Sequence, residues 1–177
     1  MTIGVISESQ RKAARVAGLT YLFTMAIVVA TNFGIHGRLI VPGNAAETAR
    51  NIMAHETLFR VGIVGFLTYG TGLVVLLTAL YVVLEPAGRG LALLAAFWRF
   101  AYALVWVFMA LNFHYALRLL HGADYLQVFE TERLQALARL YLAANFDAYY
   151  VGLPFFALAS TTCSYLWFKS EIGRAHV

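Results

Sequence analysis

Three ionisable side chains lie inside apolar stretches of this 177-residue chain and could do chemistry there. Arg99 interrupts the segment LLAAFWRFAYALVWVFMALNF, His114 directly follows that segment, and Asp147 lies in the next apolar stretch. An arginine can hold an anion or extend its charge to a membrane surface, and a histidine beside an aspartate can transfer protons. Because ionisable residues are costly within lipid, each is a candidate functional residue.

The composition predicts a membrane protein. Apolar residues make up 61% of the chain and charged residues only 12%, whereas soluble domains carry roughly 25%. The mean hydropathy is +0.71. The net charge of +4 does not indicate nucleic-acid binding, because the 13 Lys and Arg residues are dispersed at the edges of hydrophobic runs. The lipid bilayer is therefore the predicted partner, and the single cysteine excludes an internal disulfide.

Four apolar runs are long enough to cross a bilayer, whose core of about 30 Å needs about 20 residues per helix. They cover residues 16–37, 61–84, 91–117 and 144–168. No alternating strand pattern competes with them, so we expect an all-α, polytopic transmembrane helical bundle in one integral membrane domain, 1–170. The first run could instead be a signal peptide cleaved after Ala30, but its length favours an uncleaved anchor.

Two connections predict short amphipathic helices that lie along the membrane interface. Asn44 and Glu47 resemble a capping box at the start of the first helix, and the second begins near Thr131. In contrast, the connection EPAGRG is short and predicts a hairpin of the second and third spans. Small residues on the second span predict a helix-packing face: Gly62, Gly65, Thr68 and Gly72.

Depth along the spans separates the candidate residues. With a rise of 1.5 Å per residue, Arg99 lies roughly 9 Å toward the cytoplasmic side of its span's centre. His114 and Asp147 lie roughly 13 Å toward the outside, where they could pair. The outward-facing polar pocket that we predict comprises Asn32, Asn112, His114, Asn145 and Asp147.

The remaining charges have simpler interpretations. His36 and Arg60 are close enough to the surface to be interfacial anchors. For Arg99, an extension of the side chain to the headgroups, or a pairing with Glu85 or Tyr21, is favoured over a functional role. The N-terminal cluster Arg11, Lys12 and Arg15 predicts a cytoplasmic N-terminus, although later loops carry arginines that oppose this orientation: Arg38, Arg50, Arg118, Arg133 and Arg139.

Enzyme signatures are absent from the sequence, which has no HExxH, GxSxG, paired CxxC, P-loop or dinucleotide fingerprint. We therefore predict a non-enzymatic membrane module, without cofactor or metal, whose polar pocket binds a small molecule or lipid. The alternative is a transporter-like or acid–base protein that uses His114 and Asp147. A homo-oligomer or a partner membrane protein is compatible with either interpretation.

Several segments together resemble a known family of bacterial membrane proteins, domain-of-unknown-function family 4386. They are RKAARVAGLTYL, RLIVPGNAAETARNI, LFRVGI, LLAAFWRF and VGLPFF, and the resemblance extends from Arg11 to about Ser170. Positions that match the family pattern are Arg15, Arg38, Pro42, Arg60, Arg99 and Asp147. The resemblance implies the bacterial inner membrane and this architecture but no activity, and family members tend to continue into further spans.

The last seven residues, EIGRAHV, have an unusual match. A common short-read sequencing adaptor, AGATCGGAAGAGCACACGTCTGA, translates to these residues and a stop codon when one G precedes it. We therefore expect residues 171–177 to be a non-native tail, and we exclude Arg174 and His176 from any site.

Overall fold

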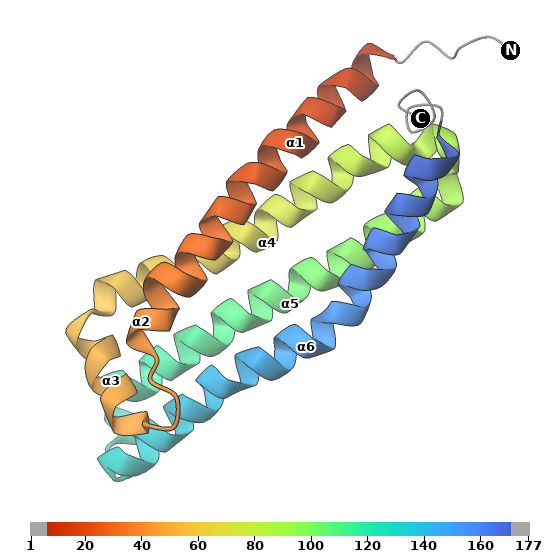
Figure 1. Ribbon diagram of the computed structural model, residues 1–177. Helices are drawn as coiled ribbons and strands as arrows, with labels where there is room; N and C mark the ends of the chain where they lie inside the picture. Colours follow the sequence, from red (N-terminus) through yellow and green to blue (C-terminus); the bar gives the residue numbers. More distant parts are fainter. Residues whose placement is uncertain (1–6, 171–177) are drawn as a thin grey trace, which may run out of the picture. The chain divides into compact units, whose positions relative to one another are not determined.

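The computed structural model describes residues 7–170, and this range is helical without any strand (Figure 1). The elements are α1 (Glu8–Val29), a π-helix (Ala30–His36), α2 (Gly37–Leu39), α3 (Ala45–Ala54), α4 (Glu56–Leu84), α5 (Arg89–His121) and α6 (Thr131–Lys169). Within the described range, four segments are long and apolar enough to cross a membrane: Glu8–Leu39, Glu56–Ala87, Arg89–His121 and Thr131–Lys169. The predicted all-α transmembrane bundle is confirmed, whereas the predicted non-native tail lies outside the described residues.

The chain divides into two compact units. Unit 1 combines Met1–Thr24, Gly70–Leu104 and Gly152–Val177. Unit 2 combines Met25–Tyr69 and Val105–Val151. The long helices α1, α4, α5 and α6 therefore contribute residues to both units.

The core of unit 1 forms where α4, α5 and α6 meet. Val83 and Leu84 of α4 pack with Ala92 of α5 and Leu166 of α6. A single 3-10 turn, Glu85–Ala87, joins α4 to α5. This tight connection produces the predicted hairpin.

The core of unit 2 is aromatic. Phe66 of α4 packs edge-to-face on Trp106 of α5, with the ring centroids 5.1 Å apart. Tyr69 also contacts Trp106, at 4.4 Å, and Phe59 contacts Phe113, at 5.6 Å. Edge-to-face pairs stabilise the packing beyond the area that they bury, and lipid supplies no hydrophobic driving force between helices.

The first predicted amphipathic helix exists as α3, and its cap has the predicted form. The backbone N–H of Glu47 donates to Asn44 Oδ1 at 2.9 Å, and Asn44 Nδ2 donates to Glu47 Oε2 at 3.0 Å. Ile52 is fully buried beneath the helix. The capping signal in the sequence therefore marks a real helix start.

The second interfacial helix does not exist as a separate element. α6 is one continuous helix of 39 residues that begins at Thr131 and includes the predicted fourth span. The reason is local: residues 131–151 contain neither glycine nor proline, so no residue interrupts the helix before Gly152.

Gly62, Gly65 and Gly72 of α4 form the predicted packing face, whereas Thr68 donates a hydrogen bond to the Val64 carbonyl of its own helix. In unit 2, His36 packs against Gly62 and Thr31 packs against Gly65. A Cβ at Gly62 would lie 2.5 Å from His36 Nε2. In unit 1, Thr24 of α1 fills the space beside Gly72 in the same way. Small residues thus allow close backbone approach, as is typical of membrane helices.

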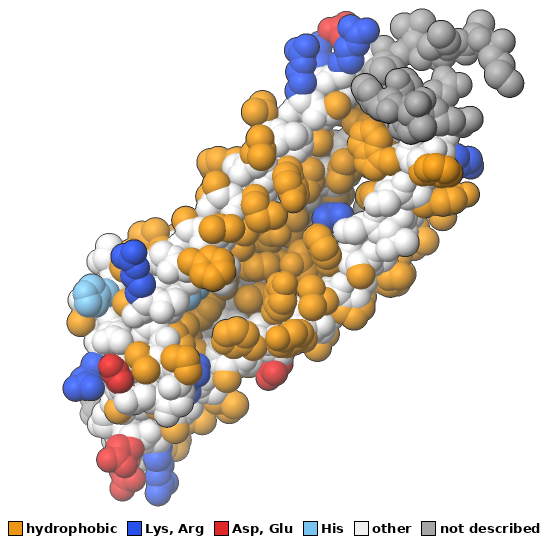
Figure 2. Space-filling model, viewed as in Figure 1, with side chains coloured by type: hydrophobic (Ala, Val, Ile, Leu, Met, Phe, Trp, Pro, Cys, Tyr) orange, Lys and Arg blue, Asp and Glu red, His pale blue; other side chains and the backbone are white. Residues whose placement is uncertain are grey.

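The surface is rich in large apolar side chains, which Figure 2 shows in orange. Leu19 is 70% exposed, Phe33 78% and Phe168 81%. So many exposed apolar residues would be unfavourable in water. The apolar helices therefore contact the lipid bilayer.

Candidate functional site

Arg99 is buried inside unit 1, where it contacts α6. The residue is 8% exposed, and its Nη2 donates a hydrogen bond of 3.2 Å to Ser160 Oγ. The guanidinium carbon also lies 5.1 Å from the ring centroid of Phe156, a cation–π distance. The side chain is directed between the helices. The expectation that it extends to the headgroups is therefore wrong.

The predicted pairing of Arg99 with Glu85 is wrong. Glu85 accepts a hydrogen bond from Tyr81 at 3.2 Å and forms an ion pair with Arg89 at 3.4 Å. The other described acid of unit 1, Glu8, pairs with Lys12 at 2.7 Å. Among residues 7–170, no ion pair therefore neutralises the charge of Arg99.

A groove with a volume of about 440 Å³ lies beside Arg99 in unit 1. Its other lining residues are uncharged and come from α1, α4 and α6. They are Ala14, Ala17, Gly18, Tyr21, Leu76, Leu80, Val83, Ser160, Cys163, Ser164 and Trp167. A second cavity on Arg99, of about 10 Å³, is too small for anything larger than a water molecule.

The burial of the lining residues shows where the groove opens. Leu76, Val83 and Arg99 are buried, so α4 and α5 form the floor. Tyr21 of α1 is 50% exposed and Ser164 of α6 is also exposed, so these two helices form the walls. Figure 2 shows the hollow between α1 and α6, lined by hydrophobic side chains, with a basic side chain visible inside it. Both walls belong to segments that are long and apolar enough to cross a membrane, so we expect the mouth to open toward lipid.

The predicted polar pocket is assembled only in part, in unit 2. Asn112 Nδ2 donates to Asn145 Oδ1 at 3.1 Å, and Asn145 is 4% exposed. Asn32 instead bonds within its own helix, to the carbonyl of Val28 at 2.9 Å. His114 and Asp147 are both exposed, and no hydrogen bond or ion pair joins these two described residues. A functional role for them stays a prediction.

The interpretation of His36 as an interfacial anchor is wrong, because its ring is 5% exposed. It stacks on Phe113 with the centroids 4.2 Å apart and contacts Phe66 at 4.8 Å. Thr31 and His36, five residues apart, would point about 140° apart on an α-helix. The i to i+5 pattern of the π-helix brings both into the core of unit 2.

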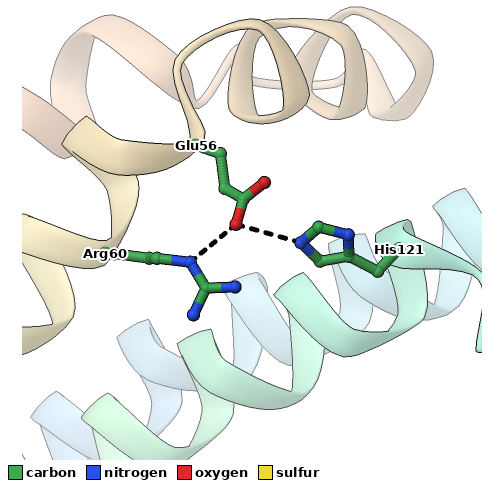
Figure 3. A network of polar contacts seen from close by, with 3 residues as sticks. All are labelled: Glu56, Arg60 and His121. Carbon is green, nitrogen blue, oxygen red and sulfur yellow. Dashed lines mark hydrogen bonds and ion pairs between the residues drawn. The ribbon is translucent and has the colours of Figure 1, made fainter.

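Arg60 belongs to an exposed polar network that joins α4 and α5 in unit 2 (Figure 3). Glu56 Oε1 accepts from Arg60 Nε at 2.6 Å and contacts His121 Nε2 at 3.1 Å. The side chains are 30%, 53% and 40% exposed, respectively. The network therefore connects two helix ends near the surface. Its Glu56–His121 contact joins residues far apart in the chain, so their spacing does not predict it.

The residues around Arg99 were also missed, although depth could have found one of them. The rule of 1.5 Å per residue, applied from the fourth span's centre near Phe156, places Ser160 roughly 6 Å from that centre, on the same side as Arg99 and close to its depth. The groove itself has no sequence signal, because its uncharged lining residues are ordinary apolar and small residues from three distant segments.

The fold and the buried charge define a polytopic helical membrane protein. The chain belongs to the family described as domain of unknown function (DUF4386), whose pattern matches residues 16–172. This match confirms the family that the sequence segments resemble. The comparisons with curated proteins and with solved structures returned no significant match.

Proposed function

We propose that this protein is a non-enzymatic membrane module that binds a lipophilic small molecule or lipid in the groove of unit 1. The observation that carries the proposal is the groove itself. Its volume of about 440 Å³ falls within the roughly 300–1,000 Å³ of small-molecule sites. As in such sites, a mainly apolar lining surrounds a few polar groups, here Arg99, Ser160 and Ser164.

This proposal places binding in unit 1 rather than at the polar residues of unit 2. Asn112 and Asn145 bond with each other, which supports a structural role for them. The alternative function, transport or acid–base chemistry by His114 and Asp147, gains no support from a contact between the two side chains. We therefore prefer the binding function.

For localisation, we propose the bacterial inner membrane with the N-terminus in the cytoplasm. The family resemblance supports the bacterial membrane. Arg11, Lys12 and Arg15 at the start of α1 support the orientation, because positive charges near the first span are retained inside. Assembly with a second copy or with another membrane protein stays a prediction.

Binding of tritiated hexadecanol to the purified protein in a non-ionic detergent tests the function. Gly18 lines the groove, and a Cβ there would meet nothing within 4 Å, so Gly18→Trp should fill the groove without disturbing the helices. Leu19→Trp is the matched control, because Leu19 is the adjacent residue, is 70% exposed and does not line the groove.

We expect saturable binding that Gly18→Trp reduces at least tenfold and Leu19→Trp leaves within twofold of the original protein. Absence of saturable binding, or equal binding by both variants, would contradict the proposed function.

A further inference from the structure

We propose that Arg99 binds the carboxylate of a single-chain amphipathic acid whose apolar tail occupies the groove of unit 1. This inference rests on the proposed function and specifies its ligand. The juxtaposition that carries it is a buried, unneutralised guanidinium in the floor of an apolar groove that opens toward lipid.

The first step concerns the charge of Arg99, which no ion pair among the described residues neutralises. A guanidinium has five N–H donors; the hydroxyl of Ser160 accepts one hydrogen bond from it, and the thiol of Cys163 also contacts it, but neither group is an acid that would balance its charge. A charge within lipid is costly and normally has a counter-ion. Because both described acids of unit 1 pair with other cations, a bound anion is the group that completes the site.

The second step concerns the size of the anionic charge. Arg99 is the single charged residue among those that line the groove. A carboxylate carries one negative charge and matches the fork of a guanidinium in two parallel hydrogen bonds. A phosphate monoester carries about −1.5 to −2, which one arginine would leave partly uncompensated in an apolar site. The charge balance therefore favours a carboxylate over a phosphate monoester.

The third step concerns the tail. Leu76 and Val83 in the floor and Tyr21 and Trp167 in the walls give the groove an apolar surface beside Arg99. An acyl chain can enter between α1 and α6 from the bilayer while its carboxylate reaches the guanidinium. A neutral long-chain alcohol would fit the same surface but would not compensate the charge.

The experiment compares tritiated palmitate with tritiated hexadecanol, at an alkaline pH that keeps the carboxylate ionised, on the original protein and on Arg99→Gln. Arg89→Gln is the matched control, because this arginine lies on the same helix, its side chain is 81% exposed and it does not line the groove. Arg99→Lys, which keeps the charge but loses the fork, is a second variant in case Arg99→Gln does not fold.

We expect Arg99→Gln to weaken palmitate binding at least tenfold, with hexadecanol binding unchanged within twofold. Arg99→Lys should bind palmitate with an affinity between those of the original protein and Arg99→Gln. Arg89→Gln should bind both ligands as the original protein does. If Arg99→Gln lost affinity for both ligands equally, or lost none for palmitate, the carboxylate assignment would be overturned. Hexadecanol binding by the original protein would still support the groove as a binding site. Tighter binding of lysophosphatidic acid than of palmitate would also overturn it, in favour of a phosphate. Failure of both ligands to bind would contradict the proposed function as well.

Discussion

At the scale of single residues, burial separates the polar side chains that hold the structure from those that do not. Asn145 is 4% exposed and accepts a hydrogen bond from Asn112, whereas His114 on the same helix as Asn112 is exposed. Hydrogen bonds between membrane helices contribute about 0.6 kcal/mol on average and up to about 1.7 kcal/mol. Asn145→Ala should therefore destabilise the protein by about 0.6–1.7 kcal/mol, and His114→Ala should change the free energy of unfolding by less than about 0.5 kcal/mol.

Unfolding in sodium dodecyl sulfate, followed by helical circular dichroism, measures both variants. If His114→Ala lowered the free energy of unfolding more than Asn145→Ala, burial would not distinguish the structural polar side chains from the others.

At the scale of elements, close approach to α4 depends on its glycines. A methyl group at Gly65 would collide with the side chain of Thr31, and one at Gly72 with the side chain of Thr24. Overpacking of this kind costs about 1–3 kcal/mol, so Gly65→Ala and Gly72→Ala should each destabilise the protein by that amount. Gly18→Ala is the matched control: its methyl group meets open space, so the variant should be neutral or stabilised by up to about 1 kcal/mol.

The same detergent titration distinguishes these variants. If Gly65→Ala and Gly72→Ala unfolded at the same detergent concentration as Gly18→Ala, the helices would not approach at these positions.

Helices were predictable from the sequence to the extent that their cause is local. Length and hydropathy located the four spans, and the Asn44 cap located α3, because both signals lie in adjacent residues. The amphipathic pattern after Thr131 predicted a separate short helix. The absence of glycine and proline from residues 131–151 was the better signal, because α6 is continuous from Thr131. The burial of His36 depends on a π-helix, which the usual period of 3.6 does not predict.

Of the candidate site, only the charged residue, Arg99, was predictable from the sequence. Hydropathy singled out Arg99, but its contact Ser160 lies 61 residues away in the chain. No single-sequence pattern encodes that distance. The pocket predicted in unit 2 grouped polar residues by depth alone, and depth does not tell which way a side chain points around its helix; His114 and Asp147 are accordingly exposed.

At the scale of the whole molecule, the chain is a membrane-spanning member of its family with an apolar exterior and one buried, unneutralised arginine among the described residues of unit 1. The exterior explains residence in the bilayer, and it requires no specific partner. The buried charge has no such general explanation, because burying a charge carries a desolvation cost that an apolar side chain does not have. The proposed ligand would give the charge a function.

Alkylation of Cys163 measures the occupation of the groove most directly. This residue is the single cysteine of the chain, it is partly exposed, and it lines the groove with Arg99. The rate of its reaction with N-ethylmaleimide, followed by mass spectrometry, should fall severalfold when palmitate is added to the original protein. In Arg99→Gln, palmitate should leave the rate unchanged. An unchanged rate in the original protein at saturating palmitate, or equal protection in Arg99→Gln, would contradict a carboxylate held by Arg99 in this groove.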